Sequence, residues 1–252
     1  MIRNYSSLAL FSLLVLLLVS CKKDNDKPPV STGSGSFTSA VFKLQLKSNV
    51  TPFIWDSLNN TNAAGNPYSV NRINMYVSNI TLKRENGLVF TFNRVYYIDA
   101  SDSLKSLIKI DSIPSGNYIE MTFLLGLDSL RNVDYGLPSS MDNLNMAWPT
   151  AMGGGYHFLK MEGHYLDSIG GKNGYAIHLG KNPNLPKMKI VKFMQQQNTQ
   201  HHYSLVFNTN EVFANPFTYN LNRDVVYTMS DSTAMYKIKT NIEDAFSLIQ
   251  NN

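Results

Sequence analysis

RINMYVSNITLKRENGLVFTFNRVYYI, residues 72–98, decides the fold class of this chain. Apolar and polar residues alternate through the first part of this stretch, which is the period of a strand with one buried face. The apolar set slips from odd to even positions near Ser78 and Asn79, which predicts a β-bulge there. Glu85-Asn86-Gly87 is a turn signal, so the stretch predicts two strands joined as a β-hairpin.

Short strand-like segments continue through the rest of the chain. They lie near Phe42–Leu46, Tyr118–Leu127, Tyr156–Leu166, Tyr175–Leu179, Met188–Met194 and Tyr203–Asn208. Helical patterning is scarce, and the best candidate is a short C-terminal helix over Asn241–Gln250 with Asn241 as its N-cap. Many short strands with polar turns predict an all-β fold, a single antiparallel β-sandwich domain over residues 37–252.

The N-terminus predicts a lipid-anchored protein of the cell envelope. Arg3 precedes an apolar run that is short for a membrane span, which is typical of a signal peptide over residues 1–20. The run ends Leu18-Val19-Ser20-Cys21 and resembles a bacterial lipobox, so we expect Cys21 to carry acyl chains such as palmitate and to anchor the protein in the membrane. A generic signal peptide with an incidental cysteine is the alternative. Residues 21–36 then form a charged, Pro- and Gly-rich flexible linker, and we expect an outer-membrane lipoprotein on the periplasmic side or the cell surface.

Composition excludes several classes of protein. Cys21 is the only cysteine, so the folded part has no disulfide, thiolate metal site or cysteine nucleophile. The formal net charge of +4 is spread along the chain, and nucleic acid is not an expected partner. Hydrolase, zinc-protease, P-loop and dinucleotide motifs are absent, so we do not expect an enzyme.

The triplet Asp-Ser-(Leu/Ile/Thr) recurs through the chain. Its serines are Ser57, Ser103, Ser112, Ser129, Ser168 and Ser232. Asp-Ser is common in turns, because both side chains bond to nearby backbone groups. The triplet also resembles an O-glycosylation sequon of some exported bacterial proteins, which makes these serines candidate acceptors.

Several motifs occur in a fixed order through the middle of the chain. They are RINMYVSNITL (72–82), YIDAS (97–101), IPSGNYIEMTFLLGLD (113–128) with Asn132, Met146-x-Trp148, Gly155-Tyr156, KMEG (160–163) and His178-Leu179-Gly180. Their order and spacing over about Phe37–Asn220 resemble the MbnP-like copper-binding domain, a β-sandwich of bacterial exported proteins and lipoproteins. The resemblance implies a mononuclear Cu(I) site. By analogy with some relatives, it also implies a partner di-haem peroxidase that oxidises a tryptophan to kynurenine.

The resemblance and the residue chemistry together select candidate ligands. In order of preference they are His178, Trp148 and Met146, and then His157, His164 and Met152. Imidazole and thioether groups suit Cu(I). Each candidate also has a plain structural interpretation, such as a packed core tryptophan or a methionine that fills the core. This chain departs from the family pattern because its first histidine after Trp148 is nine positions on, at His157.

Strand parity constrains the histidines. His157 and His164 are separated by an odd number of residues on one predicted strand, so they face opposite sides unless the strand bulges, for example at Gly163. Glu162 shares the face of His164 and is either a carboxylate that orients a histidine or half of a surface salt bridge. Two functions follow: Cu(I) capture or handling by a lipoprotein, or a surface β-sandwich that binds a protein or glycan and has lost the metal site.

Overall fold

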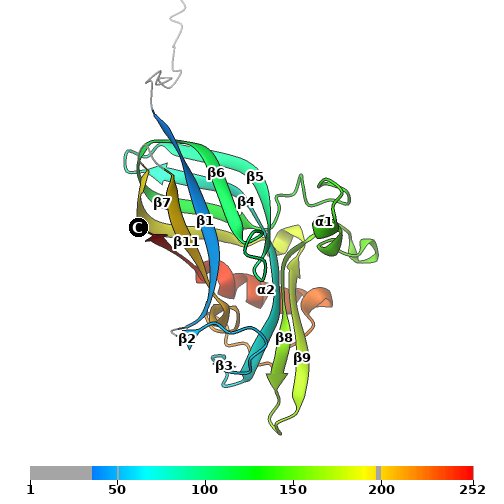
Figure 1. The fold of residues 1–252 in the computed structure, drawn as a ribbon. Helices are drawn as coiled ribbons and strands as arrows, with labels where there is room; N and C mark the ends of the chain where they lie inside the picture. Colours follow the sequence, from blue (N-terminus) through cyan, green and yellow to red (C-terminus); the bar gives the residue numbers. More distant parts are fainter. Residues whose placement is uncertain (1–35, 50, 197–199, 252) are drawn as a thin grey trace, which may run out of the picture. The chain divides into compact units, whose positions relative to one another are not determined.

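The computed structural model describes residues 36–49, 51–196 and 200–251 (Figure 1). Its strands are β1 (Phe37–Ser48), β2 (Thr51–Pro52), β3 (Asn60–Thr61), β4 (Pro67–Arg84), β5 (Val89–Asp99), β6 (Leu107–Pro114), β7 (Gly116–Leu125), β8 (His157–Leu166), β9 (Lys172–Gly180), β10 (Lys187–Gln196), β11 (His201–Asn208) and β12 (Phe246–Asn251). Its helices are α1 (Met141–Asn145) and α2 (Ser232–Asn241), with 3-10 turns η1 (Thr150–Met152), η2 (Asn182–Asn184), η3 (Thr209–Phe213), η4 (Thr228–Ser230) and η5 (Ile242–Asp244).

The predicted membrane anchor falls outside these residues. The signal peptide, Cys21 and all of the linker except Ser36 are not among them. Within the described ranges, no helix combines the length and the apolar character that a membrane crossing requires.

The predicted hairpin of residues 72–98 is confirmed. β4 and β5 pair antiparallel, and their register shifts between Ser78 and Ile80, where the bulge was expected. Asn79 adopts a φ of 50° at this point, in the left-handed region that asparagine tolerates better than most residues. The turn closes through the Gly87 N–H, which donates to the Arg84 carbonyl at 3.0 Å.

β4 organises the larger sheet. This sheet has seven strands in the order β10-β7-β4-β8-β9, with β3 and β5 also paired to β4. The first half of β4 pairs with β8 and the second half with β7, so these two strands share one edge of β4 end to end. The β8–β9 hairpin therefore extends from the N-terminal half of β4, away from β7 and β10 (Figure 1).

The second sheet faces the first and completes the predicted all-β sandwich. It has five strands in the order β12-β11-β1-β2, with β6 also paired to β1. β1 and β11 run parallel, whereas every other strand pair in the described residues is antiparallel. Phe42 and Leu205 from this sheet lie in one buried cluster with Leu82 and Phe123 from the other. The apolar faces of both sheets thus supply a common core.

The C-terminal helix is present but begins earlier than predicted. α2 covers Ser232–Asn241, and the Asp231 carboxylate caps it by accepting from the Ala234 N–H at 2.7 Å. Asn241 does not start a helix: its buried amide donates to the carbonyls of Val212 and Phe217. The residues after it form the 3-10 turn η5 and then β12, in which Phe246 and Leu248 are buried while Ser247 and Ile249 are exposed. The placement at Asn241–Gln250 was wrong because tertiary partners, not local capping, hold Asn241.

Candidate metal centre

The site lies where β8 and β9 meet the loop that precedes them. Lys160 pairs with His178 across these strands, and Glu162 pairs with Ala176. His178 and Glu162 are therefore diagonal neighbours on one face, within reach of each other. The imidazole of His178 lies 2.8 Å from the Glu162 carboxylate, measured from Nε2 to Oε1.

A bulge brings His157 onto the same face as His178. The β8–β9 register shifts between His157 and Leu159, so that His157 pairs with Gly180 while Leu159 pairs with Leu179. The extra residue, Phe158, reverses the parity of everything before it. The two imidazole rings consequently touch, with centroids 4.9 Å apart and planes at 88°. The sequence predicted opposite faces for His157 and His164 unless the strand bulged; β8 does bulge against β9, at Phe158 and not at Gly163.

His157 is held as a neutral imidazole with one free lone pair. Its backbone N–H and its Nδ1 both lie within hydrogen-bond distance of the Met146 carbonyl, at 2.7 and 3.0 Å. A carbonyl only accepts, so Nδ1 carries the proton and Nε2 does not. Burial is the main cause that lowers the pKa of His157 from 6.5 to about 4, and nearby His178 and Lys160 lower it further. The buried Nε2 has no hydrogen-bond partner within the described part of the chain.

His178 has one ring nitrogen in a hydrogen bond, and the roles of the two nitrogens are exchanged relative to His157. The Glu162 carboxylate accepts from Nε2 of His178, so in the neutral form of this imidazole the lone pair is on Nδ1. That Nδ1 is buried and, among the described residues, unpartnered. The hydrogen bond from His178 is the largest cause that lowers the pKa of Glu162, with a further lowering from Arg72, whose Nη1 lies 3.0 Å from Oε2. Glu162 is therefore ionised at neutral pH.

Trp148 packs against His157 of the imidazole pair. Its ring centroid lies 4.7 Å from that of His157, at an interplanar angle of 47°. Gly180 also lies against the Trp148 indole. A Cβ at Gly180 would lie 2.6 Å from the indole atoms Cε3 and Cζ3. The Lys181 ammonium group lies 5.8 Å from the Trp148 ring. Trp148 is 2% exposed, and its Nε1 has no partner within the described ranges.

The triple-glycine loop sets the position of Trp148. Gly153, Gly154 and Gly155 all have positive φ, a conformation that glycine adopts without strain. The loop doubles back so that the Trp148 N–H donates to the Gly155 carbonyl at 2.8 Å. The Asp134 carboxylate stabilises the loop by accepting a hydrogen bond from the Gly155 N–H at 2.7 Å. Trp148 is thereby brought next to His157, nine positions along the sequence.

The family model described as MbnP matches residues 38–231. The chain belongs to the MbnP family. A solved structure with a similar fold is MbnP from Methylosinus trichosporium, which is 14% identical, with a TM-score of 0.52 and coverage of 86% of this chain and 100% of that chain. At this identity the likeness shows the shared fold alone. No curated protein matches the sequence.

The two methionines predicted as ligands of this MbnP-family chain lie in different surroundings. Met146 is buried in a small cluster with Tyr76, Tyr156 and Phe158, and its carbonyl oxygen, not its side chain, is the group that contacts His157. Met152, in η1, lines a separate cavity that also contains Met229 and Met235.

His164 remains apart from the imidazole pair. It shares the face of Glu162 as predicted but pairs with Gly174, four residues along β9 from His178, which is about 13 Å on a strand. Its backbone N–H donates to the Ser69 hydroxyl. In the described residues, no group of three or more His, Cys, Asp or Glu side chains has the arrangement of a metal site. Of the three candidate histidines, His157 and His178 are the two whose rings lie together.

The sequence did not predict that Thr228 holds the backbone of His178. Thr228, in η4, accepts from the His178 N–H at 2.8 Å and donates to the His178 carbonyl at 2.6 Å through the same hydroxyl. Lys181 adopts a φ of 67° directly after the His-x-Gly motif. No local pattern marks Thr228, because it is 50 positions from its partner.

Most of the Asp-Ser triplets lie at turns or at the ends of elements, whereas Asp111-Ser112-Ile113 lies within β6. Five of their serines are exposed: Ser103, Ser112, Ser129, Ser168 and Ser232; Ser57 is half-buried. Asp102, Asp128, Asp167 and Asp231 bond to nearby backbone as the turn interpretation requires; for example, Asp102 accepts from the Leu104 N–H at 2.8 Å and Asp167 from the Ile169 N–H at 3.0 Å. Glycosylation of these serines stays a prediction.

Proposed function

We propose that this chain is a bacterial outer-membrane lipoprotein, anchored through Cys21, whose MbnP domain holds Cu(I) at His157 and His178. Its role is to capture or handle the metal, without catalysis of its own. The carrying observation is a pair of buried ring nitrogens, His157 Nε2 and His178 Nδ1, that have no hydrogen-bond partner among the described residues and belong to rings 4.9 Å apart.

The residues fit a soft cation better than a hard one. Imidazole nitrogen suits copper, whereas Mg²⁺ and Ca²⁺ require a shell of oxygen ligands that the imidazole pair does not supply. A buried polar atom without a partner is costly, so a bound ion would remove a penalty at both nitrogens. The lowered pKa of His157, about 4, keeps that imidazole neutral and able to ligate at neutral pH. Glu162 would fix the orientation of the His178 ring through their hydrogen bond, as carboxylates do beside metal-bound histidines.

Trp148 forms one wall of the proposed site, next to His157. An indole N–H is a donor only, so Trp148 in its unmodified form supplies no nitrogen lone pair to a cation. Oxidation to kynurenine by a partner di-haem peroxidase, proposed from the family resemblance, would create a ketone oxygen and an aromatic amine beside His157. A hollow of about 400 Å³ lined by Tyr135, Leu144 and Trp148 provides a route to the indole.

Copper titration tests the site. In anaerobic competition against a chromophoric Cu(I) chelator, wild type should bind one equivalent, and His157→Gln or His178→Gln should lose on the order of 100-fold in affinity. His164→Gln is the matched control, because it makes the same substitution on the same strand outside the pair. Equal affinity of all three variants, or less than about a tenth of an equivalent in wild type, would refute the copper site.

The second candidate function is a surface module that binds a protein or a glycan. The observation that favours it is the same hollow, whose rim carries Tyr135, 95% exposed, and Leu144, 59% exposed. Aromatic and apolar side chains at the rim of a hollow are typical of binding surfaces. A Tyr135→Ser, Leu144→Ser double variant separates the two functions, since it should abolish partner binding and leave the copper titration unchanged.

Anchoring is tested separately at Cys21. Metabolic labelling with palmitate should label wild type and not Cys21→Ser, and the variant should leave the membrane fraction. Protease treatment of intact cells distinguishes the cell surface from the periplasmic side.

A further inference from the structure

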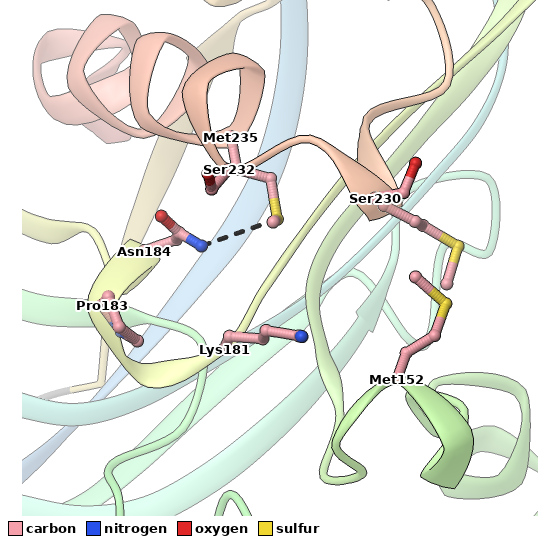
Figure 2. A pocket seen from close by; sticks show the side chains of 8 residues that line it. Met152, Lys181, Pro183, Asn184, Ser230, Ser232 and Met235 are labelled. Carbon is pink, nitrogen blue, oxygen red and sulfur yellow. Dashed lines mark hydrogen bonds between the residues drawn. The ribbon is translucent and has the colours of Figure 1, made fainter.

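Three methionines from three segments line one cavity beside the metal centre. The cavity measures about 390 Å³, and its methionines are Met152 in η1, Met229 in η4 and Met235 in α2. The polar residues of its lining are Lys181, Asn184, Ser230 and Ser232, without a carboxylate or an imidazole. Figure 2 shows the side chains of Met152, Lys181 and Met235 directed into the space between η1, η2 and α2.

Packing in the hydrophobic core accounts for the position of Met235 better than for those of Met152 and Met229. Met235 is 3% exposed and belongs to the main core. Met152 and Met229 are half-buried and lie against the edge of that core. A thioether at such a position is accessible from solvent and can change rotamer at little cost, because methionine is unbranched.

The cavity is connected to the imidazole pair through the elements that build both. Met152 lies four positions after Trp148, and Met229 directly follows Thr228, whose hydroxyl bonds to the His178 backbone. Lys181 lines the cavity and also lies 5.8 Å from the Trp148 ring. The two groups of soft ligands therefore share the segments that hold them.

The lining has the chemistry of a soft, monovalent metal site. Thioethers bind Cu(I) and similar soft ions, are never protonated at physiological pH, and do not compete for hard cations. The Asn184 amide donates to the Met235 sulfur at 3.5 Å, which orients that sulfur (Figure 2). The Lys181 ammonium opposes any cation by Coulomb repulsion. Neutral ligands beside a positive charge give weak, readily exchanged binding.

We propose that Met152, Met229 and Met235 form a second, weaker site for Cu(I), at which the ion is first taken up from solution next to the imidazole pair. The choice of copper as the ion rests on the proposed function. The residues of the site and their preference for soft cations are independent of that function, because they follow from the cavity lining and from thioether chemistry. Ag(I), which is soft and has no redox chemistry under these conditions, is a suitable probe.

The test uses the full chain with ¹³C-methyl-labelled methionine, titrated with silver nitrate in chloride-free buffer. The ε-methyl resonances of Met152, Met229 and Met235 should shift together. The internal controls are Met141, 71% exposed on α1, and Met188, 1% exposed in β10, and both should stay in place. Absence of the three shifts, or an equal shift of Met141, would overturn the site.

Variants connect the shifts to affinity. Leucine at all three positions keeps the apolar volume and should lower silver affinity at this site by at least about tenfold, whereas Met141→Leu should not change it. Lys181→Gln should raise the affinity severalfold, because it removes the opposing charge. A triple variant that binds silver as wild type does would refute the assignment.

A double variant separates this inference from the proposed function. In His157→Gln, His178→Gln the three methyl groups should still shift. If they shift while wild-type imidazole resonances do not respond to silver, the thioether site stands and the imidazole site fails. If only the imidazole resonances respond to silver in wild type, the imidazole site stands and the thioether site fails.

Discussion

Two aromatic triads in this molecule have nearly the same geometry and opposite chemistry. Phe207, Phe246 and Phe123 form one, with successive centroids 4.8 and 5.3 Å apart. Trp148, His157 and His178 form the other, with centroids 4.7 and 4.9 Å apart. Every atom of the first triad's rings gains from burial. The second triad buries three nitrogens that have no hydrogen-bond partner in the described residues. Close packing alone does not account for it.

The largest effect is expected in the phenylalanine triad. Phe207→Ala should lower the free energy of unfolding by about 3–5 kcal/mol, because a fully buried ring is removed from the common core. Urea denaturation measures this change. Copper affinity of the folded fraction should stay the same; a parallel loss of affinity would mean that the two triads are coupled.

The next largest effect is a pH dependence that belongs to His157. Its pKa lies lower in the folded protein, about 4, than in the unfolded chain, about 6.5, so the unfolded chain binds more protons between these values. The stability that His157 contributes is complete above the unfolded pKa and falls by about 3 kcal/mol as the pH drops towards 4.

Unfolding free energies of wild type and His157→Gln at pH 7.0, 5.5 and 4.5 measure this effect. The stability of wild type should fall relative to the variant as the pH decreases, and the carboxylates common to both proteins cancel in the difference. A difference that is independent of pH would show that His157 is not a buried neutral imidazole.

Gly180→Ala should have a smaller effect and act on Trp148. The new methyl group would lie 2.6 Å from the indole ring, so the indole must move, at a cost of about 1–3 kcal/mol. Near-UV circular dichroism in a Trp55→Phe background reports the displacement. Gly174→Ala on the same strand is the control, because its nearest neighbour is the Tyr227 hydroxyl at 3.3 Å. Identical spectra for Gly180→Ala and wild type would contradict the close contact.

The smallest effect is expected for Glu162→Gln. The amide oxygen can still accept from His178, but the negative charge that supports the imidazole is lost, so Cu(I) affinity should fall by about tenfold. Arg72→Gln should change it less, because Arg72 contacts only the other carboxylate oxygen and its side chain is 52% exposed. A larger loss in Arg72→Gln than in Glu162→Gln would contradict this order.

Sequence patterns predicted features that depend on neighbours in the chain. The slip of apolar residues at Ser78 and Asn79 predicted the bulge in β4, because alternation on both sides of it is clear. The bulge at Phe158 had no such signal, since β8 is buried on both faces near its start and apolar residues occupy successive positions. Without that bulge, strand parity placed His157 and His164 on opposite faces of the strand, and nothing in the sequence brought His157 to His178.

The C-terminal segment shows the same division. Asn241 before an apolar periodic run has the local signature of a helix start, but its amide is held by carbonyls 24 and 29 positions away. β12 forms because β11 offers an edge for it. Local capping preferences are about 1 kcal/mol, so long-range pairing overrides them readily.

The sequence by itself determined the all-β class, the long hairpin of β4 and β5, the family resemblance, and Trp148 and His178 as candidates. These follow from periodicity, turn chemistry and motif order, which are properties of neighbouring residues. Only the tertiary structure decided that His157 contacts His178, that Thr228 holds the backbone of His178, and that Met152 lies with Met229 and Met235. Those contacts depend on strand register and on packing between distant segments, and a single inserted residue in one strand reverses which side chains meet.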